Sequence, residues 1–256
     1  MRILALETSA KAVSAAIAED GKILAYGYQD AGLTHSRTLM PIVEDLTRES
    51  DFDIKNLDLI AVAAGPGSFT GIRIGIAAAK GLGFGLDKPV LGVSTLAAMA
   101  RNICFADGLI LCAMDARRAR IYHALFHAQD GNLTRLTEDT AIDFESLVKE
   151  LRELKKLKAG QERKRDFNLD LDLKDLKIML VGDGAKICAD YLSSQGILYK
   201  IAPANLIMQN AASVALEAEK QAREILSTSG RLPTAQELRP VYLRPPNAVP
   251  PPTVKI

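Results

Sequence analysis

The stretch that most constrains the fold is residues 64–75, with the sequence Ala-Gly-Pro-Gly-Ser-Phe-Thr-Gly-Ile-Arg-Ile-Gly. It follows a short apolar segment at 59–63 and precedes a run of small residues, so it predicts a strand, a tight turn and a helix. The two glycines that flank Pro66 let the backbone turn sharply without Cβ clashes. Ser68 or Thr70 can then supply an N-cap oxygen to the first free N–H groups of the helix.

A strand, a glycine turn and a helix N-terminus together are typical of an anion-binding corner. The Lys-Ser or Lys-Thr pair of a phosphate-binding P-loop does not follow these glycines. Two interpretations of the turn therefore stay open, a ligand loop and a plain tight turn. Ser68 is better explained as a helix cap than as a nucleophile, because no Gly-x-Ser-x-Gly elbow surrounds it.

Small residues recur at helical spacing after the turn, at Gly71, Gly75 and Ala78 or Ala79. Such a row lets another backbone approach closely, either from the same chain or from a partner. Each glycine in a helix costs about 1 kcal/mol relative to alanine. Because this predicted helix contains several glycines, close packing is expected to compensate for them.

The opening of the chain predicts a meander of three antiparallel strands with Asp20-Gly21 as one hairpin turn; the strands are Arg2–Glu7, Val13–Glu19 and Lys22–Gln29. Further strands at 59–63 and 90–93 alternate with helical segments. Antiparallel strands followed by alternating helices and strands indicate a mixed sheet covered by helices.

A helix is expected between the meander and the strand at 59–63, with Thr34 as its N-cap. Its apolar residues have the spacing of one helical face; they are Leu39, Ile42, Val43 and Leu46. From about residue 108 the chain again predicts strands, then a helix at 144–157 and a strand at 177–181. Periodicity alone thus predicts an α/β chain whose second half is a candidate duplication of the first.

Composition limits the function classes. The chain has 256 residues, enough to bury a large core, and 32 Lys and Arg against 31 Asp and Glu give a net charge of +1. A protein that binds nucleic acid on its own usually has a surplus of basic residues, so any nucleic-acid contact is expected to be shared with a partner. Three cysteines without metal spacing fit a reducing compartment. With no signal peptide and no apolar run of about 20 residues, we expect a cytoplasmic protein without membrane contact.

A charged segment and a proline-rich tail stand apart from these elements. Residues 149–175 contain a basic cluster at 155–165 that is followed by aspartates. One interpretation is an RNA-contacting patch; the favoured one is a solvated helix end and loop with opposite charges near one another. The tail at 240–256 is expected to be extended and poorly ordered.

His123 and His127 are four residues apart, as in a helical zinc pair. Alternation at 119–127 instead predicts a strand, on which four residues span roughly 13 Å. Two ligands of one zinc ion lie far closer, since each is about 2 Å from the metal. We therefore predict surface or half-buried histidines, and no metal site.

A series of short motifs covers nearly the full chain in order: 3–9, 13–17, 34–36 with 40–42, the Gly-Pro-Gly-Ser-Phe-Thr-Gly run, 92–100, 114–118, 181–184 and 240–244. Together they resemble the TsaB (YeaZ) family, accessory proteins for making threonylcarbamoyladenosine in tRNA. The resemblance implies an α/β, two-lobed actin-like fold, as in sugar kinases and Hsp70 ATPases, with mixed sheets flanked by helices and a reduced second lobe. The implied units are 1–103, 104–239 and a tail at 240–256, with the helix at about 206–225 a candidate to pack back on the first lobe.

The resemblance also implies what the first loop and one helix can do. In two-lobed ATPases the first hairpin approaches the nucleotide phosphates, so the candidate nucleotide loop here is Glu7, Thr8 and Ser9. The catalytic relative TsaD carries a metal-binding His-x-x-x-His pair, which falls on Thr95 and Met99 of this chain. Threonine and methionine suit a hard catalytic metal poorly, so this chain is not expected to repeat that chemistry.

In TsaB proteins the helix after His35-Ser36 and the glycine-rich helix bind TsaD or, in its absence, another copy. The implied interface is Ser36, Leu39, Met40, Val43, Thr70, Arg73, Ile74, Ala77 and Ala78. Met40 suits an adaptable interface and Arg73 a charged anchor. The alternative for Leu39 and Val43 is that they face the sheet, because one helical stripe cannot serve both sides.

These observations favour a noncatalytic scaffold subunit that activates a TsaD-like catalytic subunit for threonylcarbamoyl transfer to adenosine 37 of tRNA. The resemblance implies a TsaE-like ATPase as a further partner, tRNA contact through the complex, and a homodimer when the chain is alone. No cofactor is expected for this chain, while ATP and Mg²⁺ are used by partner subunits. The alternatives are an actin-fold small-molecule kinase or ATPase, with Glu7 and Asp183 as its carboxylate pair, and a self-assembling regulatory homodimer.

Overall fold

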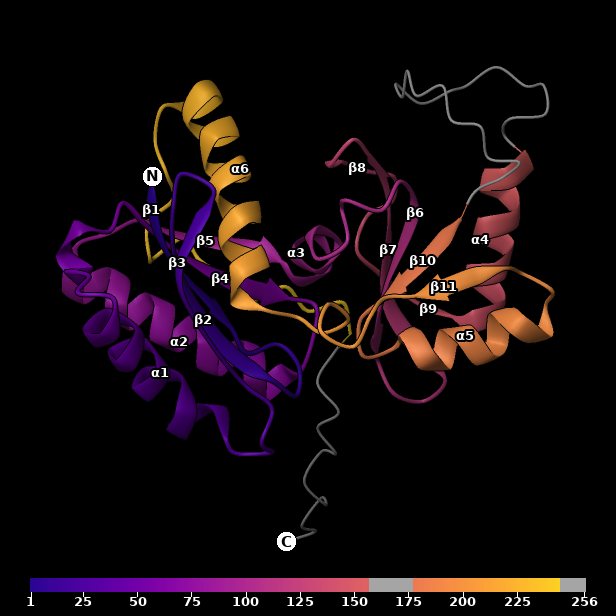
Figure 1. Cartoon of the computed structure of the whole chain (residues 1–256), viewed down its shortest axis with the longest axis horizontal. Coiled ribbons are helices and arrows are strands. Elements are labelled where there is room, and N and C mark those ends of the chain that lie inside the picture. Colours follow the sequence, from indigo (N-terminus) through magenta and orange to yellow (C-terminus); the bar gives the residue numbers. More distant parts are fainter. Residues whose placement is uncertain (157–176, 245–256) are drawn as a thin grey trace, which may run out of the picture.

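The computed structural model describes residues 1–156 and 177–244, and it has two lobes side by side (Figure 1). Each lobe is a β-sheet with helices packed on its faces. Most of the charged segment, 157–175, and the prolines beyond Arg244 lie outside the described residues. Within the described part of the chain, no helix has the length and apolar character needed to cross a membrane.

The sheet of the first lobe has the strand order β3-β2-β1-β4-β5. Its strands are β1 (Arg2–Glu7), β2 (Val13–Glu19), β3 (Lys22–Gln29), β4 (Leu59–Gly65) and β5 (Val90–Ser94). β1, β2 and β3 pair antiparallel, whereas β4 pairs parallel with both β1 and β5. Asp20 and Gly21 both have positive φ, as a tight hairpin turn between β2 and β3 requires. The predicted meander and mixed sheet are therefore confirmed.

Helices cover both faces of this sheet (Figure 1). On one face, the helices α1 (His35–Glu49) and α2 (Phe69–Leu86) pack against the sheet around an apolar core. A short 3-10 helix, η1 (Ile54–Asn56), precedes β4. On the opposite face lies α6 (Ala211–Ser229), which packs on β1 and β2 although it follows the second lobe in sequence. The chain thus crosses to the second lobe and returns.

The short helix α3 (Thr95–Arg101) connects the lobes. Ser94 caps it by accepting a hydrogen bond from the Ala97 N–H. One side of α3 packs on α6, and the other packs on β6 and β7 of the second sheet. Thr95 and Met99, where the resemblance places the metal pair of TsaD, are both buried here.

The sheet of the second lobe has the strand order β11-β10-β6-β7-β8, with β9 also paired to β7. Its strands are β6 (Gly108–Asp115), β7 (Arg120–Gln129), β8 (Asn132–Arg135), β9 (Thr140–Asp143), β10 (Ile178–Val181) and β11 (Tyr199–Ile201). The helices α4 (Phe144–Lys156) and α5 (Ala185–Ser194) cover the face opposite to α3. The sequence patterns do not predict β9, α5 or β11.

The prediction of surface or half-buried histidines is wrong. His123 and His127 lie on β7 and are buried, because α4 and its neighbours cover this face of the strand. His123 Nε2 lies 3.2 Å from the Glu150 carboxylate of α4. In the ranges 1–156 and 177–244, no group of three or more His, Cys, Asp or Glu side chains is arranged to hold a metal ion.

The small residues of α2 have an intramolecular partner at one end of the helix. A Cβ at Gly71 would overlap the carbonyl oxygen of Thr8, and a Cβ at Gly75 would overlap the Thr8 hydroxyl. The Thr8 hydroxyl also donates a 2.7 Å hydrogen bond to the Gly71 carbonyl. By contrast, nothing lies within 4 Å of a Cβ at Gly81 or Gly85.

We expect Gly71→Ala and Gly81→Ala to change stability in opposite directions. The first substitution forces a methyl group against a backbone oxygen and should lower the free energy of unfolding by about 2–3 kcal/mol. The second replaces an open helical glycine and should raise it by up to about 1 kcal/mol. Urea unfolding at 25 °C measures both, and a Gly71→Ala protein as stable as the wild type would contradict the packing described here.

Candidate functional site

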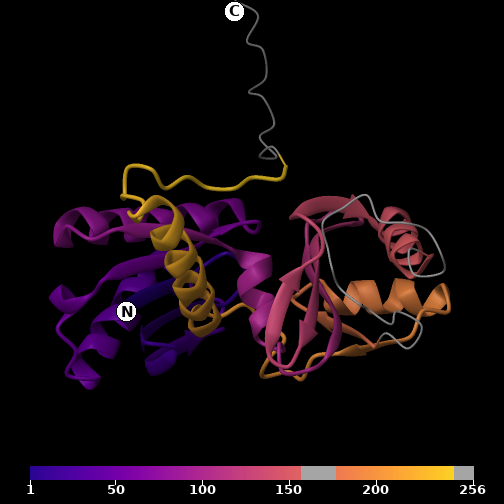
Figure 2. The same cartoon turned by 90° about the horizontal axis from the view of Figure 1, so that it is seen from above.

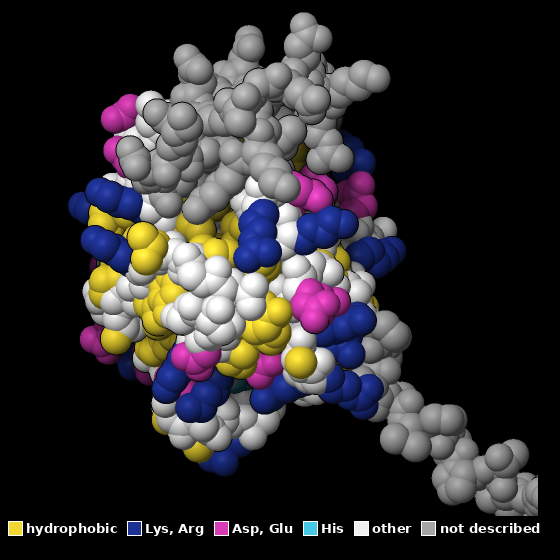
Figure 3. Space-filling view, turned by 90° about the vertical axis from the view of Figure 1, so that its right-hand side faces the viewer, with side chains coloured by type: hydrophobic (Ala, Val, Ile, Leu, Met, Phe, Trp, Pro, Cys, Tyr) yellow, Lys and Arg dark blue, Asp and Glu magenta, His cyan; other side chains and the backbone are white. Residues whose placement is uncertain are grey.

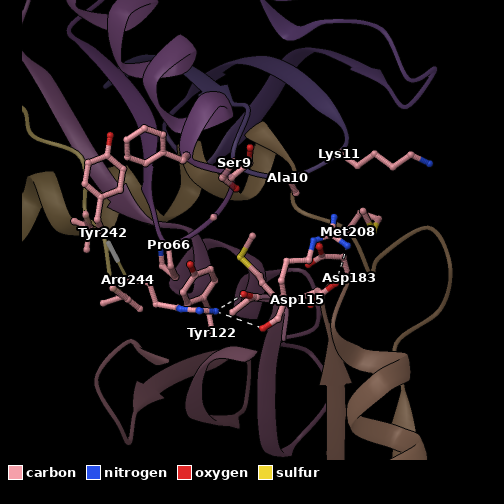
Figure 4. Close-up of a pocket in the computed structure, with 18 residues that line it drawn as sticks. Ser9, Ala10, Lys11, Pro66, Asp115, Tyr122, Asp183, Met208, Tyr242 and Arg244 are labelled. Atoms are coloured by element: carbon pink, nitrogen blue, oxygen red, sulfur yellow. Dashed lines mark hydrogen bonds and ion pairs between the residues drawn. The ribbon is translucent and has the colours of Figure 1, made fainter. Parts of the chain in front are cut away.

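A cavity of about 610 Å³ lies between the two lobes (Figure 4). The first lobe contributes residues 9–11 and 66–69, and the second lobe contributes residues 114–117 with Asp183. Residues 241–244, which come after α6, form a further wall, and Tyr122 and Met208 also line the cavity. The cavity has the size of a small-molecule site and mixes cationic with acidic side chains.

The glycine turn forms one side of this cavity and is attached to the first loop. The Ser68 N–H donates a 2.6 Å hydrogen bond to the Ser9 carbonyl. The Ser68 hydroxyl caps α2 by accepting from the Gly71 N–H, whereas Thr70 lies exposed inside the helix. Ser68 is therefore the N-cap of α2. The turn is hydrogen-bonded to the first loop and also lines the cavity.

The candidate nucleotide loop divides into two parts. Ser9 lines the cavity, whereas Glu7 and Thr8 are buried and contact their own chain. The Glu7 carboxylate accepts a 2.5 Å hydrogen bond from the Ser9 N–H. Burial raises the pKa of Glu7 from 4.5 to about 7, and the hydrogen bonds with Ser9 offset only part of this effect.

Asp183 from the second lobe approaches the same region. It lines the cavity and accepts a 3.2 Å hydrogen bond from the Gln209 amide. Burial raises the pKa of Asp183, and the charge of Asp183 in turn contributes to the raised pKa of Glu7. The two carboxylates named in the kinase alternative therefore interact electrostatically, although only Asp183 lines the cavity.

Three basic residues lie along the cavity. Lys11 follows the first loop, Arg117 follows β6, and Arg244 comes from the end of the described chain (Figure 4). Arg117 pairs with Asp115 at 3.2 Å. The cavity lining thus contains both basic and acidic side chains, and the Lys11 ammonium also lies 3.6 Å from the Asp30 carboxylate.

The predicted partner interface is only partly on the surface. Leu39 and Val43 are 1% and 2% exposed and belong to the core between α1 and the sheet, so assigning them to a partner surface is wrong. They face inward because this side of α1 supplies the apolar stripe that anchors the helix. The remaining predicted residues are exposed or partly exposed: Ser36, Met40, Thr70, Arg73, Ile74, Ala77 and Ala78.

Arg73 already has partners within the chain. Its guanidinium lies 3.8 Å from the centre of the Phe69 ring, and its Nε donates a 2.9 Å hydrogen bond to the Tyr242 hydroxyl. Sequence reasoning missed Tyr242, because the tail was expected to be poorly ordered. That expectation is wrong for residues 240–244, although the motif at 240–244 was a usable signal.

We expect the titration of Glu7 to appear in the pH dependence of stability. Between pH about 4.5 and 7 the unfolded chain loses the Glu7 proton while the folded chain keeps it, so stability falls as the pH rises through this window. The free energy of unfolding of the wild type minus that of Glu7→Gln should therefore decrease by about 3 kcal/mol from pH 4 to pH 8. Urea titrations at each pH measure it, with the exposed Glu44→Gln as the substitution control. A pH-independent difference for Glu7→Gln would contradict the burial effect.

Comparisons with known proteins agree with this architecture. The family model described as "TsaD: tRNA N6-adenosine threonylcarbamoyltransferase" matches residues 29–249. The tRNA threonylcarbamoyladenosine biosynthesis protein TsaB of Escherichia coli is 35% identical over 144 residues, 56% of this chain and 62% of that protein. The protein of the same name from Bacillus subtilis is 35% identical over 153 residues, 60% of this chain and 67% of that protein. The chain therefore spans less than two thirds of the first relative's length and about two thirds of the second's.

A solved structure extends the match to nearly the whole chain. It is a Pseudomonas aeruginosa protein described as uncharacterized with similarity to peptidase YeaZ, and it has a TM-score of 0.71 and 25% sequence identity. The match covers 95% of this chain and 99% of that chain, and it confirms the predicted two-lobed α/β, actin-like fold. Sequence and structure thus agree: this chain belongs to the TsaB (YeaZ) family.

Proposed function

We propose that this chain is a noncatalytic subunit that binds and activates a TsaD-like transferase for threonylcarbamoyl transfer to adenosine 37 of tRNA. The proposal rests on the outer face of α2, which contains glycines that no contact within the described chain requires. Gly71 and Gly75 are needed by the contact with Thr8, but Gly81 and Gly85 have open space where a Cβ would be. Their cost of about 1 kcal/mol each has no compensation within the described chain, and a partner that packs closely on this face would supply it.

The side chains around these glycines support the same role. One exposed stripe of α2 has helical spacing and consists of Thr70, Arg73, Ala77, Gly81 and Phe84. Phe84 is 60% exposed, and Met40 on the neighbouring helix α1 is 38% exposed. Small residues flanked by exposed apolar and arginine side chains favour close docking of another helix. We call this stripe together with Ser36 and Met40 the docking face.

The proposal of a noncatalytic role is supported by the residues at the interlobe helix. Thr95 and Met99 occupy the positions that correspond to the metal pair of TsaD; both are buried, and Met99 packs in the core between α3 and the second sheet. Neither side chain suits a hard catalytic metal. Under this proposal the chain shifts the catalytic subunit toward its active conformation through binding energy alone.

We propose that the remaining partners bind to the complex of this chain with the TsaD-like subunit. A TsaE-like ATPase would dock where the two subunits meet, ATP and Mg²⁺ would be used by the partners, and the chain alone would dimerise through the docking face. tRNA would reach the complex mainly through other subunits, since the net charge is only +1. On the end of the second lobe, Lys and Arg side chains are interspersed with acidic and apolar ones (Figure 3).

A second candidate function rests on the interlobe cavity. A magnesium-dependent kinase or ATPase of this fold would need a carboxylate from each lobe; Asp183 lines the cavity, and its charge acts on the buried Glu7 of the first lobe. Magnesium-dependent ATP hydrolysis by the isolated chain, lost in Asp183→Asn, would favour this candidate over the noncatalytic role.

We expect Ala77→Arg to weaken binding of the TsaD-like subunit from the same genome by at least tenfold. Ala77 is exposed at the centre of the docking face, so a long charged side chain there blocks close helix packing without entering the core. Calorimetric titration measures the affinity, and thermal unfolding verifies that the fold is intact. Ala204→Arg, at an exposed alanine of the second lobe, is the matched control and should bind like the wild type. Equal affinities for both variants would contradict the proposed face.

A further inference from the structure

The segment that follows α6 runs back along the first lobe and then across to the second (Figure 2). Ala235 and Leu238 are buried in the core of the first lobe, which fixes the start of the crossing. Residues 241–244 then pass over the interlobe cavity and form part of its wall. Residues 235–244 therefore contact both lobes.

On the first lobe the crossing is held by backbone and aromatic contacts. The Val241 N–H donates a 2.8 Å hydrogen bond to the Ala64 carbonyl at the end of β4. A Cβ at Gly65 would overlap the Val241 carbonyl, so glycine there permits the approach. The Tyr242 ring lies 4.8 Å from the Phe69 ring, between centroids, and its hydroxyl accepts from Arg73.

On the second lobe the crossing is held by Arg244. Its guanidinium donates to the Ala116 carbonyl at 2.5 Å and to the Arg117 carbonyl at 3.4 Å. The turn that begins here is strained, because Arg117, Arg118 and Ala119 all have positive φ, at 63°, 56° and 55°. A cationic side chain on its carbonyls therefore stabilises a turn that L residues adopt reluctantly.

We propose that residues 240–244 are a clasp that joins the two lobes and completes the docking face; this inference rests on the proposed function. Val241 and Tyr242 are 44% and 37% exposed beside Arg73, so they extend the exposed surface of α2. Tyr242 and Phe69 hold the Arg73 guanidinium in place before any partner arrives. A preordered arginine loses less side-chain freedom when it docks, which strengthens binding.

The clasp also makes docking depend on the second lobe. Arg244 is its anchor on that lobe, and Tyr242 is its contact with the docking face only two residues earlier. Loss of the Arg244 contact weakens the attachment of Tyr242 without abolishing it, because Val241 still bonds to Ala64 and the Tyr242 ring still packs on Phe69. The partner that fits this surface is the TsaD-like subunit, bound through α2 and the clasp together.

The test compares the full-length wild type with Arg244→Ala, Tyr242→Phe and Arg239→Ala. Arg239 is the matched control, because its guanidinium contacts only the nearby carbonyls of Gln236 and Leu238 among the hydrogen bonds described. We expect Arg244→Ala and Tyr242→Phe to weaken binding of the TsaD-like subunit by about three- to tenfold. Both variants should still unfold cooperatively, with a lower midpoint for Arg244→Ala because the turn at Ala116 and Arg117 loses its cationic contact. Arg239→Ala should bind like the wild type.

A second measurement needs no partner. The Val241 amide reports clasp closure, because its hydrogen bond to Ala64 protects it from exchange. Its hydrogen exchange should quicken by at least tenfold in Arg244→Ala and stay unchanged in Arg239→Ala. Unchanged exchange in Arg244→Ala would overturn the clasp whatever the partner does. If exchange quickens and Ala77→Arg weakens binding while Arg244→Ala does not, the proposed docking role stands and the clasp's part in it is overturned.

Discussion

The contact between Thr8 and α2 is the constraint on which the rest of the first lobe depends. The carbonyl and hydroxyl of Thr8 occupy the space that side chains at Gly71 and Gly75 would fill, so the helix lies directly on the first loop. This close approach fixes three things at once. It places the glycine turn beside Ser9 at the cavity, it directs the opposite stripe of α2 outward, and it brings Phe69 and Arg73 to the edge where Tyr242 arrives. A shift of α2 by one side-chain diameter would disturb all three.

The interlobe cavity is lined by Ser9 and the glycine turn from the first lobe and by Asp183 from the second, whereas Glu7 is buried behind the first loop. Glu7 ends β1 where a metal-holding carboxylate is expected in two-lobed ATPases, but here it is buried, bonded to Ser9 and outside the cavity lining. A carboxyl with a pKa of about 7 is partly protonated near neutral pH and is a weaker cation ligand than an ionised one. Glu7 and Thr8 thus pack within the first lobe, while Ser9 faces the cavity.

The regular elements of the first lobe could be predicted from sequence because their signals are local. Asp20-Gly21 marks the hairpin, and the spacing of Leu39 and Val43 marks the buried side of α1. The same spacing does not tell whether these apolar residues face a partner or the sheet. In the structure Leu39 and Val43 face the sheet and belong to the core. The strands β9 and β11 were missed because segments of four and three residues carry little periodicity. Tyr242 was missed because its contact with Arg73 spans 169 residues.

We propose that this chain acts by binding to a catalytic subunit and not by chemistry of its own. Reconstitution tests it most directly, with the TsaD-like and TsaE-like proteins, the enzyme that makes threonylcarbamoyl-adenylate and a transcribed tRNA. Threonylcarbamoyladenosine formed in the tRNA would be measured while this chain is titrated into the mixture. The docking role predicts little product without the chain and a yield that saturates near one chain per catalytic subunit. Full modification in its absence would contradict that role.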